Sequence, residues 1–241
     1  MNEKSEIVPW KEQMALDAQR VAKQERPASS FISLKSGVMT YQDEQIKDNI
    51  LECIVIALCT ERTYYDKPYD PDSIFPPRCF AQGLDPTGLI PHDNIVEPIN
   101  PTCNGCEKAE FGTALQGKGP ACKTYRKLMI MTSDHLKKDD IEEAEIAVIR
   151  IPPTSVKNWS NYANKIASSV GVPPWAVLTK IIVKPHPKKQ FEVTFEAVGN
   201  IEGDGVLSQL HARIEGAEAG LLTPYTYDTD EEEVTEDSDK Y

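Results

Sequence analysis

The chain has 241 residues, 40% of them hydrophobic and 27% charged, which is enough for one large folded domain or two small ones. Its formal charge of −12 is concentrated at the C-terminus, because residues 228–241 contain eight acids and one lysine. Residues 1–227 carry only −5, so the overall charge does not exclude an anionic ligand. No apolar run approaches the roughly 18–20 residues that span a bilayer. The first ten residues lack the apolar region of a signal peptide, which favours a cytoplasmic protein over a secreted or membrane protein.

The first part of the chain predicts an arm followed by two strands. Residues 1–29 are polar, with irregularly spaced apolar positions, and predict a mobile arm or a helix that docks late. Residues 31–41 alternate loosely around Gly37, which indicates a strand with a bend or bulge. Residues 50–60 are nearly continuously apolar, as in a strand buried on both faces, and this strand is expected to continue to Tyr65.

Residues 71–122 have a different composition. Eight prolines interrupt this segment, so we expect no regular helix or strand to run through it. A structureless insertion of about fifty residues inside a compact domain needs a separate source of stability.

Regular structure is expected again after Cys122. The predicted elements are strands at 125–132 and 144–151 around a charged turn at 135–141, a helix at 154–170, a hairpin of 175–184 and 190–198, and a helix at 205–219. The helix at 154–170 has apolar residues at spacings of three and four, a cap from Thr154 or Ser155, and Gly171 at its end.

This order of elements predicts a mainly β, α+β fold. Because few helices follow the strands, it favours an OB-like Greek-key barrel over a parallel doubly wound sheet. The expected domains are the arm at 1–29, the OB-like domain at 30–227 with its insertion at about 71–122, and an acidic tail at 228–241. The tail is too poor in apolar residues to fold alone.

Four cysteines in the insertion have the spacing of metal ligands. Cys103 and Cys106 form a Cys-x2-Cys knuckle, Cys122 follows in a tight turn, and Cys79 lies upstream. Four thiolates satisfy tetrahedral zinc and leave no coordination position open, so such an ion is structural and not hydrolytic. Its binding would contribute on the order of 10 kcal/mol toward ordering the insertion.

Two alternatives remain open for these cysteines. Cys103 and Cys106 alone can serve as a redox pair, and His92 can replace Cys79 as the fourth ligand. Cys53 and Cys59 lie in the apolar strand and are expected to be buried free thiols.

Five short motifs occur in order between residues 61 and 126. They are Glu61-Arg-Thr-Tyr-Tyr65, Tyr69-Asp-Pro-Asp, Pro76-Pro-Arg-Cys-Phe-Ala81, Cys103-x2-Cys106-x4-Phe111-Gly112 and Gly117-Lys-Gly-Pro-Ala-Cys122-Lys-x2-Arg126. Together they resemble a group of tailed-phage and prophage proteins over roughly residues 50–200. The four cysteines fall in the pattern of this family, so the resemblance implies zinc.

The expected barrel-like body and acidic tail are similar, separately, to phage and bacterial single-stranded DNA-binding proteins. That resemblance implies a protein of phage replication or recombination, located in the host cytoplasm, that protects or organises single strands. Lys240, which interrupts the acids just before Tyr241, departs from the tail pattern.

Single-strand binders need a cationic track for phosphates and exposed rings for bases. Residues 103–138 contain seven bases and three acids, and residues 176–190 contain four lysines and no acid, so each segment carries +4. The predicted DNA contacts are Tyr64, Tyr65, Tyr69, Lys118, Lys123, Tyr125, Arg126, Lys127, Lys180, Lys184, Lys188 and Lys189. Phe80 and Phe111 are expected to pack the insertion instead, and Trp159 and Tyr162 are expected to belong to the core.

The polyanionic tail is predicted to compete with DNA for the cationic track and to dock replication or recombination proteins. The residues assigned to this docking are Asp228, Asp230, Glu231, Glu232, Glu233, Glu236, Asp237, Asp239 and Tyr241. A terminus that only aids solubility is the alternative, and the sequence leaves self-association into a homo-oligomer open.

The sequence does not favour an enzyme, because it lacks a nucleophile elbow, a metalloprotease helix and a complete phosphate loop. The second hypothesis is a zinc-stapled protein-interaction factor that acts on a host or phage replication or recombination enzyme without binding DNA. The −5 charge of residues 1–227 favours this second hypothesis over a general nucleic-acid binder.

Overall fold

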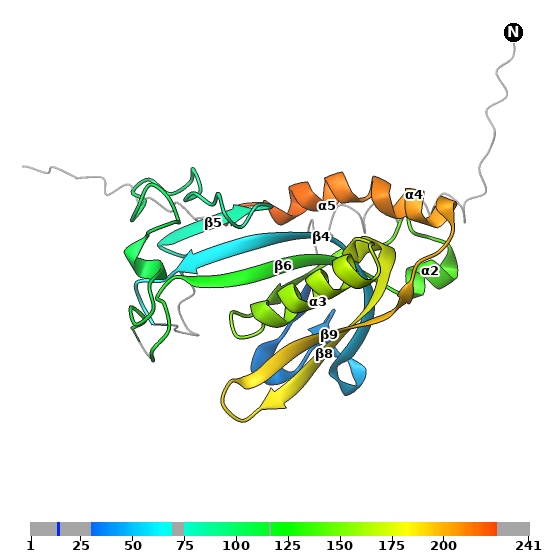
Figure 1. The fold of residues 1–241 in the computed structure, drawn as a ribbon, viewed down its shortest axis with the longest axis horizontal. Helices are drawn as coiled ribbons and strands as arrows, with labels where there is room; N and C mark the ends of the chain where they lie inside the picture. The colour runs from blue at the N-terminus through cyan, green and yellow to red at the C-terminus, as the bar shows by residue number, and fades with distance from the viewer. Residues whose placement is uncertain (1–13, 15–29, 69–74, 116, 226–241) are drawn as a thin grey trace, which may run out of the picture.

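The computed structural model describes residue 14 and residues 30–68, 75–115 and 117–225. The expected N-terminal arm, apart from Met14, and the acidic tail at 228–241 lie outside these residues. Figure 1 shows a twisted sheet with helices packed on its two faces and the insertion at one end.

One mixed sheet organises the molecule. Its strands are β1 (Ser30–Ser33), β2 (Thr40–Tyr41), β3 (Glu44–Gln45), β4 (Ile50–Tyr64), β5 (Cys79–Gly83), β6 (Lys123–Thr132), β7 (Ala147–Ile151), β8 (Val177–His186) and β9 (Gln190–Asn200). They lie in the order β3-β2-β1-β7-β6-β4-β8-β9, and β5 pairs with the distal part of β4. Among the described strand pairs, β1 with β7 is parallel and the others are antiparallel.

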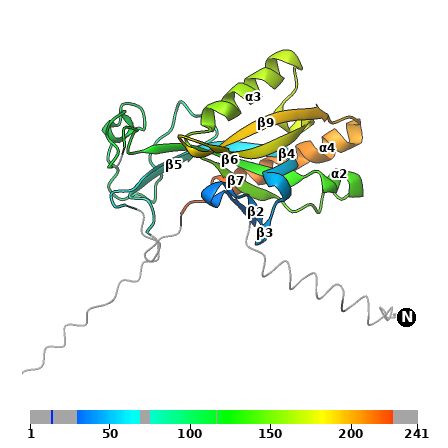
Figure 2. The same ribbon diagram turned by 90° about the horizontal axis from the view of Figure 1, so that it is seen from below.

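The sheet curls into a half-barrel, as the view from below in Figure 2 shows. A mainly β fold with few helices is thereby confirmed. The closure of a Greek-key barrel of the OB type stays a prediction.

The helices are α2 (Asp134–Lys138), α3 (Val156–Ser169), α4 (Asp204–Ala212) and α5 (Ile214–Leu221). Short 3-10 turns occur at η1 (Lys35–Gly37), η2 (Lys47–Asn49), η3 (Glu107–Ala109) and η4 (Pro174–Ala176). Within the described part of the chain, no helix is long and apolar enough to cross a membrane.

Strand β4 is the centre of the fold because both of its faces are covered. On one face, Cys53 and Val55 belong to a core that includes Trp159 and Tyr162 of α3, so these two aromatic residues are core residues as predicted. On the other face, Ile54 belongs to a second core, which includes residues of α4 and α5. A bulge between Val55 and Ala57 shifts the alternation of the strand.

Most strands lie where the apolar pattern predicts them, since that pattern is local. Strand β4 reaches Tyr64, and β8 and β9 form the expected hairpin. Gly37 lies at a bend with φ of +79°, between β1 and β2. Cys53 and Cys59 are buried free thiols, as expected.

The expectation that no strand crosses residues 71–122 is wrong, because β5 forms there. Its five residues lie between Pro77 and Pro86, in a window without proline, and β4 supplies a complete antiparallel partner. The region 71–122 is therefore attached to the sheet by backbone hydrogen bonds before its loops begin.

Three smaller expectations also need correction. The charged turn at 135–141 starts as the short helix α2, and the helix expected at 205–219 is two helices joined at Arg213. The guanidinium of Arg213 donates to the backbone carbonyls of Glu142 and Ala144 at this junction. Helix α3 has no side-chain cap, because the Ser155 hydroxyl accepts the backbone N–H of Val193 at 2.9 Å instead.

Candidate metal centre and nucleic-acid interface

The loops of the insertion fold around a small cavity that the four predicted ligands share. Cys79, at the start of β5, lines it together with Cys103, Cys106 and Cys122, which come from the loops between β5 and β6. The cavity has a volume of about 20 Å³, close to the space that one water molecule or one ion fills. Residues separated by up to 43 positions in the sequence are therefore brought to one place.

The backbone of these loops is held by a regular set of hydrogen bonds. The N–H of Cys103 donates to the carbonyl of Leu89 at 3.0 Å, and the N–H of Cys122 donates to the carbonyl of Lys108 at 2.7 Å. Gly105, inside the knuckle, has φ of +74°, a conformation that side chains with a Cβ rarely adopt. The knuckle thus turns tightly enough to carry Cys103 and Cys106 to the same cavity.

Burial and mutual proximity disfavour the charged form of three of the four thiols around the cavity. Burial raises the pKa of Cys79, Cys103 and Cys122, the last to about 12, and neighbouring thiols raise these pKa values further. The charge of Arg62 opposes this effect at Cys103 and Cys122, and its guanidinium donates to the Cys103 carbonyl at 2.9 Å. A metal ion that binds to these thiols would have to displace their protons.

The chemistry of the donor set fits zinc, although the side chains are not in a coordinating arrangement. In the described residues, no three histidine, cysteine or acidic side chains converge tightly enough to hold an ion as they stand. Four thiols around a cavity of ionic size are nevertheless the donors of closed structural zinc sites.

His92 does not belong to this cavity, so the alternative ligand loses support. Its ring stacks on Phe80 with a centroid distance of 4.7 Å, and its Nδ1 accepts the backbone N–H of Asn94 at 3.1 Å. Phe80 itself is 1% exposed and packs the insertion as predicted.

A buried ionic cluster, which the sequence analysis did not predict, joins the insertion to the sheet. Glu61 of β4 is 1% exposed and lies 2.5 Å from Arg150 of β7 and 3.9 Å from Lys127 of β6. Gln82 of β5 donates to the Glu61 carboxylate at 3.0 Å. Tyr225, near the C-terminal end of the described chain, also hydrogen bonds with Glu61. A charged residue at position 150, inside the apolar run of a predicted strand, was the available signal for this cluster.

Some of the predicted phosphate-binding side chains are engaged inside the protein. The ammonium of Lys127 donates to the carbonyl of Leu221 at 2.8 Å and is mostly buried. Arg126 is half-buried beside Thr60, and Lys180 pairs with Glu52 at 3.3 Å. Their charges are therefore partly neutralised by protein groups before any ligand arrives.

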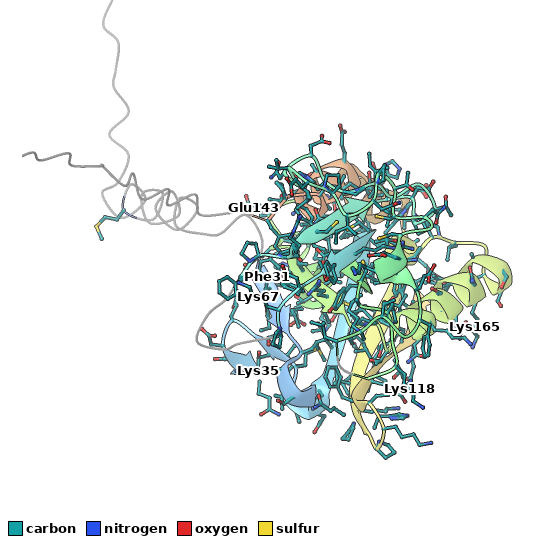
Figure 3. The ribbon with its side chains drawn as sticks, turned by 90° about the vertical axis from the view of Figure 1, so that its left-hand side faces the viewer. Phe31, Lys35, Lys67, Lys118, Glu143 and Lys165 are labelled. Atoms are coloured by element: carbon teal, nitrogen blue, oxygen red, sulfur yellow. The ribbon has the colours of Figure 1, made fainter. Side chains whose placement is uncertain are left out.

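Other predicted cations are accessible to solvent at the insertion and on the β8–β9 hairpin. Lys118 is exposed in the loop of Gly117 and Gly119, and Lys123, at the start of β6, is partly exposed. Lys184 and Lys188 are exposed at the turn of the β8–β9 hairpin. Figure 1 shows the insertion at the left end of β4 and β6 and the hairpin turn at the lower edge of the molecule, and Figure 3 shows Lys118 on the side of the insertion that faces α3 and the hairpin.

The remaining predicted lysine, Lys189, is exposed to solvent and also contacts protein groups. Its ammonium lies 3.4 Å from the carbonyl of Thr154 and 3.9 Å from Glu192.

The predicted stacking rings differ in how freely they are presented. Tyr64 lines the cysteine cavity and lies under the ammonium of Lys108, while Tyr125 is covered by the guanidinium of Arg150 at 3.5 Å from its centroid. Tyr65 is 39% exposed, and Tyr69 lies outside the described residues. The expectation for Phe111 is wrong, because its ring is 81% exposed and does not pack the insertion.

A second hollow, of about 490 Å³, lies between α3 and β9. Lys165 and Glu196 both line it, so its charge is balanced, and Tyr162 and Phe195 form its apolar floor.

Comparisons with known protein families, curated proteins and solved structures find no match to this chain.

Proposed function

We propose that this protein binds single-stranded DNA through the end of the sheet that carries a zinc-stapled insertion. Cys79, Cys103, Cys106 and Cys122 would hold the structural zinc ion, and the ion would fix the loops in place without taking part in chemistry. The scaffold under this site is the curled sheet, which we infer to be a partly open barrel of the OB type.

The observation that carries the proposal is that two lysines at the insertion and two on the β8–β9 hairpin are left without an acidic partner among the described residues. Lys118, Lys123, Lys184 and Lys188 form no ion pair with any residue that the structure describes, in a protein that is acidic overall. In a chain with net charge −12, four lysines without an acidic partner among the described residues are candidate contacts for a polyanion.

Salt dependence gives the first test of this proposal. Fluorescence anisotropy with a labelled oligo(dT) should show an affinity that falls with salt at a slope of about −3, because four phosphate contacts to a single strand each contribute about −0.7. The same measurement with a duplex of equal length should give weaker binding. A Lys118→Ala, Lys188→Ala double variant should reduce the slope by about 1.4, or half.

The matched control is Lys137→Ala, which removes an exposed lysine of α2, at the opposite end of the sheet in Figure 1. Its slope should equal that of the unaltered protein. Equal slopes for the control and the double variant would contradict the proposed track.

Deletion of residues 228–241 should tighten DNA binding several-fold at low salt. Tyr225, the last residue of the described chain, packs on Phe80 of the insertion with a centroid distance of 5.0 Å. The difference between the truncated and full chains should shrink as salt rises, since competition between the tail and DNA is electrostatic. An unchanged affinity across the whole salt titration would remove the competition between tail and DNA.

One observation favours the second candidate, a protein-interaction factor. Half of the exposed large apolar side chains of the described chain lie in the insertion: Phe75, Leu84, Ile90, Val96, Phe111 and Leu115. Apolar side chains that gather on one part of a surface are typical of protein interfaces. If zinc-loaded protein shows no salt-dependent affinity for any oligonucleotide, this candidate replaces DNA binding.

A further inference from the structure

Phe111 is a large ring that the fold leaves in water. Its 81% exposure contrasts with the 1% exposure of Phe80 in the same insertion. A single exposed apolar residue is common on protein surfaces and needs no explanation by itself. The fixed backbone on either side of Phe111 and the charges near it indicate that the ring can contact a ligand.

The backbone on either side of Phe111 is fixed rather than loose. The N–H of Gly112 is shared between the carbonyls of Lys118 at 3.1 Å and Gly119 at 3.2 Å. The Thr113 hydroxyl donates to the carbonyl of Glu110 at 2.7 Å and accepts the N–H of Ala121 at 2.9 Å. The segment between Cys106 and Cys122 is therefore a closed loop, and the ring stands on its outer surface.

The position directly after the ring also favours a sharp turn. Gly112 has φ of +94°, and a Cβ at this position would meet nothing within 4 Å. The glycine is therefore required by the backbone conformation and not by crowding. This turn presents Phe111 without covering it, so the backbone that carries the ring is already ordered before a ligand binds.

The charges near Phe111 suit a phosphate. The hydrogen bonds of Gly112 bring the backbone of Lys118 close to the residue that follows the ring, and the exposed Lys118 forms no ion pair with a described residue. Lys108, in contrast, is paired with Glu107 at 2.9 Å. A free cation beside an exposed ring is the arrangement by which single-strand binders hold one phosphate and one base.

Two of the tyrosines predicted to stack on bases, Tyr64 and Tyr125, are less suited to stacking. Tyr125 already stacks under Arg150, and Tyr64 lines the cysteine cavity under Lys108. Phe111, unlike these two tyrosines, is highly exposed, and Lys118, which is close to it along the loop, forms no ion pair with a described residue.

We propose that Phe111 is a ring on which a base of bound single-stranded DNA stacks, with Lys118 contacting the adjacent phosphate. This assignment rests on the proposed DNA binding and names a residue that carries it. Because every base has a flat aromatic face, the contact would hold single strands regardless of sequence and would exclude paired bases.

Substitution of the ring tests the assignment. In anisotropy with oligo(dT) at fixed salt, Phe111→Ala and Phe111→Leu should each weaken binding about tenfold, because both remove the aromatic face. Phe111→Tyr and Phe111→Trp should keep the affinity within about twofold of the unaltered protein. The salt slope should stay unchanged in all four variants, because no charge is removed.

A spectroscopic readout separates stacking from a structural role. The added tryptophan of Phe111→Trp should be quenched by oligo(dT) after subtraction of the signal from the three native tryptophans. The control is Val96→Ala, which removes a 95% exposed apolar side chain elsewhere in the insertion and should leave affinity unchanged. Zinc content and thermal unfolding of each variant are measured alongside.

The outcomes distinguish this inference from the function on which it rests. If the unaltered protein binds with a clear salt slope while Phe111→Ala or Phe111→Leu binds equally well, the stacking role is wrong and DNA binding stands. If the Phe111→Trp variant binds oligo(dT) without quenching of its added tryptophan, the stacking role is likewise wrong and DNA binding stands. If the unaltered protein binds no single strand at low salt, both proposals fall.

Discussion

Serine at any one of Cys79, Cys103, Cys106 or Cys122 is expected to remove stoichiometric zinc from the purified protein. Three thiolates leave a buried coordination position to a weaker ligand, and a structural site of this kind contributes on the order of 10 kcal/mol when complete. Elemental analysis should therefore find about one zinc per chain in the unaltered protein and a small fraction of that in each variant.

The loss should unfold the insertion and spare the sheet. Neither of the two large apolar cores contains a residue from 71–122, and the buried apolar residues there are Phe80, Ala81, Leu89 and Ile95. A metal chelator should thus open residues 84–122 to proteolysis while the main thermal transition moves little. Mass spectrometry of the fragments locates the cuts.

Cys53→Ala is the matched control for the zinc prediction. This thiol is fully buried beside α3 and lies outside the cavity, so the variant should lose stability through packing and keep its zinc. An unaltered protein that contains no zinc, or four serine variants that all keep it, would contradict the proposed centre. Loss of zinc only from the Cys103 and Cys106 variants would favour a two-thiol site.

The sheet was largely predictable because its signals are local. Residues 50–60 read as a doubly covered strand from their apolar content, and β4 forms there with cores on both faces. Helix α3 follows a spacing of three and four that needs no tertiary information. Strand β5 was missed, because the count of prolines across 71–122 hid a short window in which a neighbouring strand could pair.

Contacts between residues far apart in the sequence determine which basic side chains are free and which rings are exposed, and the sequence pattern does not show these contacts. The net charge of residues 103–138 was counted as if every basic side chain faced solvent. The Lys127 ammonium instead pairs with Glu61 and donates a hydrogen bond to a backbone carbonyl. Phe111 was assigned to packing because aromatic residues near cysteine ligands commonly serve that role, whereas the closed loop around it turns the ring outward. Neither outcome is encoded in the spacing of residues along the chain.

The placement of the four cysteines was predictable from the sequence only in part. Their spacing marked them as a set, and the structure brings all four to one cavity, which sequence alone could not do for Cys79. Arg62 was recognised only as part of a motif, and its contact with Cys103 gives it a physical role in balancing the charge of thiolates.

Glu61→Gln is expected to destabilise the protein by about 2–3 kcal/mol, the largest effect of any single charge change away from the cysteines. The change leaves Arg150 and Lys127 without their shared carboxylate, and breaking a fully buried pair costs about 3–5 kcal/mol. The expected value is lower because the Arg150 side chain remains 35% exposed, and water can solvate part of its charge. Urea unfolding followed by circular dichroism measures the difference.

The matched control for this charge is Glu52→Gln, on the same strand. Glu52 pairs with Lys180 at 3.3 Å, but its side chain is 40% exposed, so its loss should cost less than about 1 kcal/mol. An Arg150→Met, Glu61→Gln double variant should recover part of the loss, because the unpaired cation is then removed together with the acid. Equal costs for the Glu61 and Glu52 changes would show that the buried cluster contributes no more than an ordinary surface pair, and that packing alone holds the insertion end of the sheet.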